Sequence, residues 1–540
     1  MRLNKTPFES GYGSLPNEIR MELHHKYKTV LAFLFLLLFA FLTRFVQLGE
    51  NPSGFFRDEA DKGYTTYSLL QTGKDQSGRR LPFFVRSLHV TTSSLYQYLD
   101  IPFVMGLGLT EQAVRLPACF AGTLSVLAVF LLLRLWWGNR YALWGALFVS
   151  LSPWNFLLSR WANQSSLLMA WIPLGMVFFY LAVTREKKNW IYLIGSVFFF
   201  LLALYTYAPA RLVIPVLLVC VWGVSLFADR PHGIRGARLW KMAGVFWGLF
   251  LLGCIPLAQH ILFESAQSTS RLSQITIWGD QPILPAMLEF IKNYALHVSP
   301  GFLFFHGDGN LRHSTAVFGQ VHWYVFPLLL AGMIRCVRRR EWIDRLLLVW
   351  LFCFPLAAAC TRESIPHALR SVFAVPILQI LSVYGMMEWE DWIKKSPNRF
   401  SPTFIIMGKR LWILSLVICA GLYFFDYYVR YPVYSAVHWE YGYREAITWW
   451  RDRVEEDNQT VVSGIAEYPY IFFLYYDRYS PQAWIENQEI AGVTFIPTGQ
   501  PVQRFFERGE QTTFYLLRPH ELPGFRADKA ILLPSGDAIW

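Results

Sequence analysis

The sequence lacks the short motifs that identify many soluble enzymes. It contains no H-E-x-x-H or C-x-x-C motif for metal or redox chemistry, no G-x-S-x-G nucleophile motif and no phosphate-binding P-loop. Charged residues are also scarce: they make up 16% of the 540 residues, whereas 54% are apolar. The apolar residues form runs long enough to cross the hydrocarbon core of a bilayer, so we expect a mainly α-helical, multi-pass membrane protein.

Cysteine is rare, and the polar region 430–540 has none. All seven cysteines lie in or beside apolar runs, which indicates buried apolar side chains and not a disulfide framework. The net charge of +11 does not indicate nucleic-acid binding, because most Lys and Arg residues lie in short connections between apolar runs. The first run has no A-x-A type cleavage site, so we expect it to be retained as an anchor.

Length and hydropathy predict about eleven transmembrane helices. They are expected at 29–48, 113–135, 141–158, 166–184, 190–207, 210–228, 241–263, 321–337, 345–361, 367–387 and 410–429. Every even-numbered gap between them contains Lys or Arg, as at Arg338–Arg340. Because such residues are retained in the cytoplasm, the pattern predicts a cytoplasmic N-terminus and an extracytoplasmic C-terminal region, in the inner (cytoplasmic) membrane of a cell.

Three parts are expected along the chain. They are a cytoplasmic leader at 1–28, a transmembrane catalytic domain at 29–429 and an extracytoplasmic α/β domain at 430–540. The transmembrane domain has two long outer segments, 49–112 and 264–320.

Local patterns assign structure to two of these regions. In the first outer segment, Glu59–Gln71 and Ser94–Leu107 have the helical spacing of amphipathic helices that lie in the membrane interface. The C-terminal region alternates helical patterns with β-rich runs, which indicates a small α/β domain that caps the site or docks the acceptor. The β-rich runs are Thr460–Ile465, Val493–Ile496, Thr512–Leu517 and Ala530–Leu533.

Two adjacent carboxylates, Asp58 and Glu59, follow the first apolar run. Ionised carboxylates are costly near a membrane, so the pair indicates a functional use. Asp58 is a candidate general base, and the alternative is that its carboxylate caps the helix that follows. The two roles are compatible, because a cap can hold a base in position.

The second outer segment contains G-D-G-N-L-R-H at 307–313. Arg312 and His313 offer donors suited to phosphate oxygens, and the glycines permit a tight turn. The alternative is an ordinary Asx-type turn with solvated charges.

A third cluster lies at the predicted outer mouth of the tenth span. Helical spacing would put His367 and Arg370 on one face, where an unpaired cation is expensive and implies an anionic partner. That partner is either a substrate or a protein carboxylate such as Glu363. Arg160 opens the second outer gap, where it could bind a substrate or anchor the interface.

Together these stretches resemble the GT-C class of membrane glycosyltransferases, in particular the dolichyl-phosphate-mannose-protein mannosyltransferase-like group that includes the aminoarabinose transferase of lipid A. The resemblance covers about residues 28–430. It rests on the order of D-E-A at 58–60, L-Y-Q-Y-L at 95–99, V-R-L-P at 114–117, L-S-P-W at 151–154, S-R at 159–160, G-D-G-N-L-R-H at 307–313 and H-A-L-R at 367–370.

The resemblance implies an inverting transfer of a sugar from a polyprenyl-phosphate carrier to an acceptor hydroxyl at the outer side of the membrane. Asp58 matches the base of that class, and Glu59 matches its usual neighbour. The remaining expected site residues bind the donor phosphate or line the substrate pocket. The phosphate group is Arg312, His313, His367, Arg370 and Arg160, and the pocket group is His89, Tyr96, Asp308 and Asn310.

Two departures from the family pattern limit what can be carried over. V-T-T at 90–92 stands where many relatives have a basic-Pro-Pro segment, and Leu157–Ser166 lacks an acid that some relatives have there. No metal ligand is therefore predicted, and the need for a divalent metal stays open. The expected partners are the bilayer, a polyprenyl-phosphate-linked sugar and an acceptor glycan, lipid or protein, without nucleic acid.

Two other functions fit parts of the pattern. A lipid-linked saccharide flippase would use the outer charges as a headgroup site without making a bond, and it predicts polar residues deep in the spans. The middles of the predicted spans are nearly free of charge, which favours the transferase. A polymerase or ligase of surface polysaccharide would differ from it mainly in the acceptor.

Overall fold

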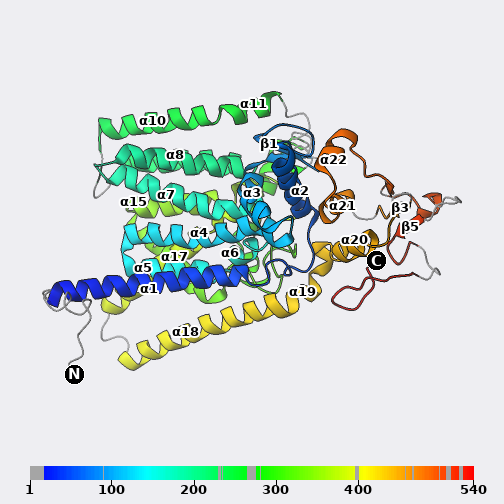
Figure 1. Cartoon of the computed structure of the whole chain (residues 1–540). Coiled ribbons are helices and arrows are strands. Elements are labelled where there is room, and N and C mark those ends of the chain that lie inside the picture. Colours follow the sequence, from blue (N-terminus) through cyan, green and yellow to red (C-terminus); the bar gives the residue numbers. More distant parts are fainter. Residues whose placement is uncertain are drawn as a thin grey trace, which may run out of the picture.

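A computed structural model describes residues 17–539 except 89, 229–232, 234, 264–274, 280, 396–400, 456–457, 465–466, 498, 506–512 and 522–526. The long helices run side by side, and the first outer segment and the C-terminal region, which hold the two small sheets, lie at one end of them (Figure 1). Helix α1 (Asn17–Phe45) begins at the opposite end, so the start of the first helix and the C-terminal region lie at different ends of the bundle (Figure 1).

Within the described residues, eight helical stretches are long and apolar enough to cross a membrane, and a bent pair makes a ninth. The pair is α10 (Ala237–Gly253) with α11 (Ile255–Phe263). The others are residues 26–45 of α1, α4 (Glu111–Trp137), 164–184 with α7 (Leu168–Thr184), α8 (Asn189–Thr206), α9 (Ala210–Phe227), 342–359 with α15 (Trp342–Cys353) and α16 (Leu356–Ala359), 372–395 with α17 (Ile377–Lys395), and 402–434 with α18 (Pro402–Phe425).

These nine stretches match nine of the eleven predicted spans. The other two predictions fall on shorter helices, α5 (Asn139–Ser150) with α6 (Pro153–Leu158), and α14 (Phe326–Arg339). At 1.5 Å per residue, α5 and α14 are only about 18 and 21 Å long. Both are packed into the bundle, α5 against α4 and α14 against α17. The count of eleven therefore stays a prediction.

The first outer segment is a compact unit. It contains α2 (Arg57–Thr72), a hairpin of β1 (Phe84–Ser87) and β2 (Val90–Ser93), and α3 (Leu95–Leu107). The two predicted helices are present, but α2 is buried on most of its faces instead of lying exposed in the interface. Gly63 explains its close packing, because a Cβ atom there would lie 2.6 Å from the Tyr475 ring and 2.7 Å from Val114.

The C-terminal region has the predicted mixture of helices and strands. A parallel three-stranded sheet has the order β4 (Val493–Phe495), β3 (Gln459–Val462) and β5 (Thr513–Leu516). The strand predicted at Ala530–Leu533 is absent, since Leu532 forms only a single bridge with Ala538. The helices of this region are α19 (Tyr431–Tyr434), α20 (Tyr443–Arg451), α21 (Tyr470–Tyr476) and α22 (Pro481–Asn487).

The first outer segment and the C-terminal region share one hydrophobic core. Phe55, just before α2, packs on Tyr475 of α21 with ring centroids 4.8 Å apart. Tyr64 of α2 donates a hydrogen bond to the Tyr479 carbonyl oxygen, which follows α21. The C-terminal region therefore helps to fix the helix that carries Asp58 and Glu59.

Candidate active site

The start of α2 is held by Glu59. This buried carboxylate accepts hydrogen bonds from Arg115 at 2.9 and 3.0 Å, from the Ala162 N–H at 2.8 Å and from the Phe56 N–H at 3.3 Å. All of these partners belong to the protein and no edge of the carboxylate is exposed. The prediction of a catalytic Glu59 is therefore corrected, because this residue caps α2 and fastens it to neighbouring segments.

Asp58, the neighbouring residue, differs from Glu59 in its exposure and in its hydrogen bonding. Its side chain is half-buried, and none of the described residues donates a hydrogen bond to its carboxylate. It is therefore not the helix cap, since Glu59 fills that place. The charged groups that interact with it electrostatically include Arg312 and Glu440. A half-buried carboxylate with accessible lone pairs can accept a proton from a substrate, as a general base must.

Arg312, in the second outer segment, interacts electrostatically with Asp58. Its guanidinium carbon lies 3.7 Å from the centroid of the Phe56 ring, a close cation–π contact. Burial lowers the pKa of Arg312, and Asp58 and Glu440 partly oppose this. Among the described residues no side chain or carbonyl accepts a hydrogen bond from its guanidinium. Its planar donors are therefore available to an anion such as a phosphate.

An ion pair between Arg57 and Glu440, which was not predicted, lies next to Asp58. Glu440 lies between α19 and α20, and its carboxylate binds the Arg57 guanidinium at 2.7 Å and the Arg57 N–H at 2.8 Å. Arg57 precedes Asp58, so the pair fastens the C-terminal region to the start of α2. Nothing in the sequence pattern singled out Glu440, because the contact joins residues 383 positions apart.

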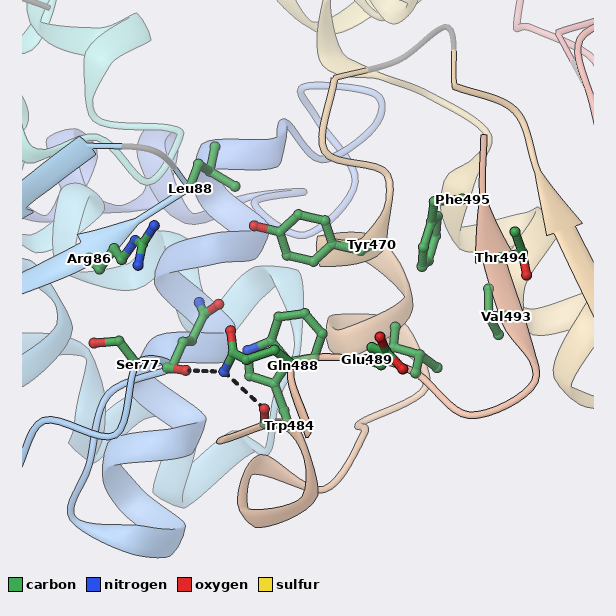
Figure 2. Close-up of a pocket in the computed structure, with 12 residues that line it drawn as sticks. Ser77, Arg86, Leu88, Tyr470, Trp484, Gln488, Glu489, Val493, Thr494 and Phe495 are labelled. Atoms are coloured by element: carbon green, nitrogen blue, oxygen red, sulfur yellow. Dashed lines mark hydrogen bonds between the residues drawn. The ribbon is translucent and has the colours of Figure 1, made fainter. Parts of the chain in front are cut away.

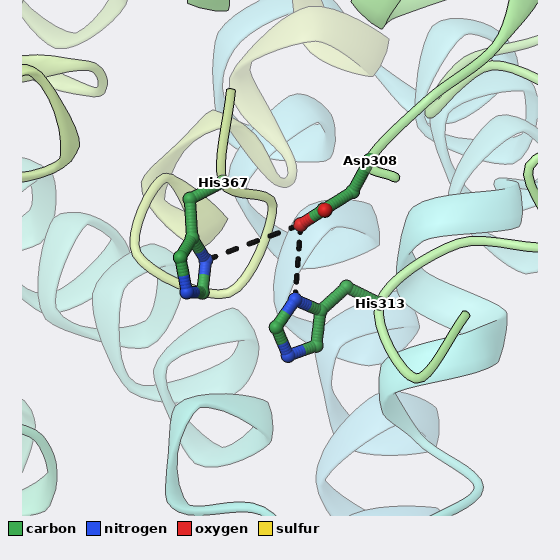
Figure 3. Close-up of side chains that lie close together, drawn as sticks. All are labelled: Asp308, His313 and His367. Carbon is green, nitrogen blue, oxygen red and sulfur yellow. Dashed lines mark hydrogen bonds and ion pairs between the residues drawn. The ribbon is translucent and has the colours of Figure 1, made fainter. Parts of the chain in front are cut away.

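Asp308, His313 and His367 form a buried cluster (Figure 3), and His313 directly follows Arg312 in the chain. One oxygen of Asp308, Oδ2, lies 2.9 Å from His313 Nδ1 and 4.0 Å from His367 Nδ1. The two imidazole rings are stacked with centroids 4.7 Å apart. Burial, then the neighbouring His313, holds the pKa of His367 well below its usual range, so its ring is neutral near pH 7. The structure thus brings three predicted site residues together.

Arg370 is paired within the protein. Its guanidinium binds Glu363 Oε2 at 2.8 Å, the Glu363 carbonyl oxygen at 3.0 Å and Thr361 Oγ1 at 3.0 Å. The predicted helical face with His367 is wrong, because residues 367–371 form a turn and α17 begins only at Ile377. The protein carboxylate that the sequence left open is therefore the partner, and the phosphate role of Arg370 is corrected.

Arg160 is also a structural residue. It is fully buried, and its guanidinium donates to the Tyr427 hydroxyl at 2.9 Å and to carbonyl oxygens in the last turn of α1 and just after it. Since its donors are used by the protein, the predicted phosphate contact is corrected. The carbonyl acceptors are those of Thr43, Arg44, Val46, Gln47 and Asn51.

Three predicted pocket residues remain. Tyr96 is fully buried and donates its hydroxyl to the Val114 carbonyl oxygen at 2.8 Å, so its placement in a substrate pocket is corrected. Asn310 is half-buried and accepts the Arg312 N–H at 3.0 Å, as the Asx-type turn predicts. His89 lies outside the described residues.

A cavity of about 600 Å³ lies between the first outer segment and the C-terminal region (Figure 2). Tyr470 and Trp484 stack in its wall with centroids 5.4 Å apart, and Arg86 of the first outer segment lies across from Tyr470. Gln76 of the same segment also lines the cavity. Gln76 also donates to Asp61 Oδ1 at 3.1 Å, which links the wall of the cavity to the second turn of α2. Aromatic rings beside amide and charged groups suit a polar organic ligand.

Comparisons with known proteins agree with the architecture. Residues 97–252 match the protein family described as dolichyl-phosphate-mannose-protein mannosyltransferase. No curated protein sequence matches the chain.

Solved structures match over most of the chain. ArnT from Cupriavidus metallidurans bound to undecaprenyl phosphate is similar with a TM-score of 0.57 and 12% identity, over 89% of this chain and 89% of that one. Apo ArnT gives a TM-score of 0.54 at 12% identity, over 89% of this chain and 90% of that one. AglB from Archaeoglobus fulgidus, an oligosaccharyltransferase in complex with an inhibitory peptide and a dolichol-phosphate, gives 0.50 at 11% identity over 84% of this chain.

The chain spans 64% of the length of AglB, less than two thirds. These likenesses show a shared fold, so the chain has the GT-C fold and the predicted fold class is confirmed.

Proposed function

We propose that this protein is an inverting glycosyltransferase that moves a sugar from a polyprenyl-phosphate carrier to an acceptor hydroxyl. One observation carries the proposal: among the described residues the Asp58 carboxylate has no hydrogen-bond donor and the Arg312 guanidinium has no acceptor, and the two charges interact electrostatically. A base beside an unpaired guanidinium is the set of groups that this reaction needs. The matches to the mannosyltransferase family and to ArnT bound to undecaprenyl phosphate support the carrier.

The proposed reaction needs one base and one cation. Asp58 takes the proton of the acceptor hydroxyl while its oxygen forms a bond to the anomeric carbon. The bond from that carbon to the phosphate oxygen breaks, and its electron pair leaves with the polyprenyl phosphate. Arg312 stabilises the charge that develops there. A phosphate leaves as an anion without a proton, so no second carboxylic acid is required, in contrast to a glycosidase. Attack opposite to the leaving group inverts the anomeric carbon.

The acceptor is proposed to enter through the cavity between the first outer segment and the C-terminal region. Its wall contacts Asp61, which is one helical turn after Asp58 on α2. The C-terminal region would then dock the acceptor and also fix α2 through the ion pair of Arg57 and Glu440.

The site is proposed to face the outer side of the cytoplasmic membrane. Lys394 and Lys395 end α17, and after a short connection α18 begins at the end of the bundle away from α2 (Figure 1). Basic residues at that end are expected to remain in the cytoplasm. The proposed domain boundaries are the ones predicted from the sequence, with the transmembrane catalytic domain at 29–429.

Replacement of Asp58 by asparagine tests the proposal. Asp58→Asn keeps the shape of the side chain but cannot accept the proton, so transfer from a labelled polyprenyl-phosphate sugar should fall by about 10²- to 10⁴-fold. The purified full-length protein is assayed in detergent with candidate glycan, lipid and protein acceptors. Glu50→Gln removes one exposed carboxylate from the same outer segment and should keep the wild-type rate.

The result that contradicts the proposal is near-normal turnover by Asp58→Asn at a normal yield of folded protein. A second contrary result is movement of the labelled carrier across a reconstituted bilayer without any covalent product. That outcome would identify a flippase.

A further inference from the structure

We propose that Asp308, His313 and His367 bind one divalent metal ion of the zinc type. The sequence predicted no metal ligand, and the three residues come from two segments more than 50 positions apart. Their ligand atoms all lie within 4.8 Å of one another. All three side chains are buried, and both rings turn toward the same carboxylate oxygen (Figure 3).

The spacing of these atoms fits a tetrahedral site. With metal–nitrogen and metal–oxygen bonds of about 2.0 to 2.2 Å, ligand atoms around zinc lie roughly 3.3 Å apart. The two distances from Asp308 Oδ2, 2.9 Å to His313 Nδ1 and 4.0 Å to His367 Nδ1, lie on either side of that value. Small rotations of the two rings would therefore bring both nitrogens to bonding distance of one ion.

The donor chemistry also fits. Two imidazoles with one carboxylate are a familiar ligand set for zinc and other first-row metals, and they leave at least one coordination position open. His367 Nδ1 accepts a long hydrogen bond of 3.4 Å from the Arg370 N–H, so this nitrogen carries no proton in that tautomer. It faces the Asp308 carboxylate at 4.0 Å without a hydrogen bond between them. Two acceptors that face each other in a buried place are stabilised by a cation between them.

The surrounding groups hold the three ligands in place. The Asp308 carboxylate accepts the Ala368 N–H at 2.8 Å and the Asn310 N–H at 2.9 Å. The His367 N–H donates to His297 Nε2 at 2.9 Å, and His297 Nδ1 binds the Asn293 carbonyl oxygen at 2.7 Å. Hydrogen bonds of this kind orient the ligands of metal sites. His297 itself is fully engaged and is not a ligand.

The position of the cluster suggests what the metal does, and this part rests on the proposed function. His313 directly follows Arg312 in the chain. A divalent ion with one carboxylate and two neutral imidazoles keeps one net positive charge, which attracts an anion in a buried place. Its open position would take an oxygen of the donor phosphate, the same group that Arg312 binds in the proposed reaction.

Metal content tests the site without any activity assay. The full-length protein, purified in detergent without a histidine tag, is stripped with a chelator, dialysed against micromolar Zn²⁺ and analysed by mass spectrometry of metals. Wild type and His306→Gln should each retain about one zinc per chain. His306 is an exposed histidine in the same segment and serves as the matched control. The double variant His313→Gln/His367→Gln should lose the ion, and Co²⁺ should give a tetrahedral visible spectrum only in the proteins that bind.

Absence of metal from the wild type overturns the proposal, whether or not the variants fold. Equal metal content in wild type and in the folded double variant overturns it too, and leaves a hydrogen-bonded Asp–His cluster. The transfer assay separates the two proposals. Full activity of chelated wild type would refute the phosphate role of the metal while the transferase stands. Bound zinc with no transfer from any polyprenyl-phosphate sugar would refute the transferase while the metal site stands.

Discussion

Arg312 offers the sharpest test of how the proposed site works. The sequence supplied three arginines as candidate phosphate ligands, and the structure leaves only Arg312 among them without a described protein acceptor. Arg312→Gln removes the charge and the planar pair of donors but keeps a polar side chain. The prediction is that this variant folds normally and transfers sugar slowly.

The expected size of the effect follows from the contacts. Hydrogen bonds to charged groups contribute about 1.5 to 3 kcal/mol each, and a guanidinium can donate two to one phosphate. A loss of about 3 to 5.5 kcal/mol in the transition state corresponds to a fall of about 10²- to 10⁴-fold in kcat/KM. The cost in stability is smaller, since the cation–π contact with Phe56 that the variant gives up is worth about 0.5 to 2 kcal/mol.

The assay compares kcat/KM for a labelled donor with Tm in the same detergent. Arg312→Lys should be intermediate, because lysine keeps the charge but loses the fork and the stacked plane. Arg430→Gln is the control. It removes an equal charge from an exposed side chain just after α18 and should behave as wild type. The reasoning is refuted if Arg312→Gln keeps more than about a third of the wild-type kcat/KM, or if its loss of activity is explained by unfolding.

Two predictions concern stability. Arg160→Met should lower the unfolding free energy by roughly 3 kcal/mol or more, because buried carbonyls at the end of α1 and just after it lose their donors. A lower Tm with unchanged kcat in the folded fraction would show it. For Asp61, burial raises the pKa to about 6 from an ordinary 3.8. The folded state holds the proton more tightly, so stability present below about pH 4 is lost as the pH rises to about 6, by about 3 kcal/mol. Asp61→Asn should remove this slope from Tm measured against pH, and a slope of equal size in the variant would contradict the assignment.

The sequence by itself determined the class of protein and its fold. Apolar runs of about 18 residues or more have the length of a transmembrane helix, in which every backbone polar group is hydrogen-bonded within the helix. Nine spans could therefore be located from composition and length. The position of Asp58 after the first span, and the alternation of strands and helices in the C-terminal region, also followed from local signals. The strand predicted at Ala530–Leu533 was wrong. This run is only four residues long, and in the structure Leu532 forms a single bridge with Ala538 instead of a strand.

Only the tertiary structure decided which charged groups are available for chemistry. Asp58 and Glu59 are neighbours in sequence, yet helix geometry turns Glu59 toward Arg115 in the core and leaves Asp58 at the edge of the site. Arg160 and Arg312 look alike in sequence, yet Arg160 binds carbonyls at the end of α1 and Arg312 packs on Phe56. The reason is physical: the availability of a charge depends on the partners that distant segments bring to it, and no local pattern records those partners.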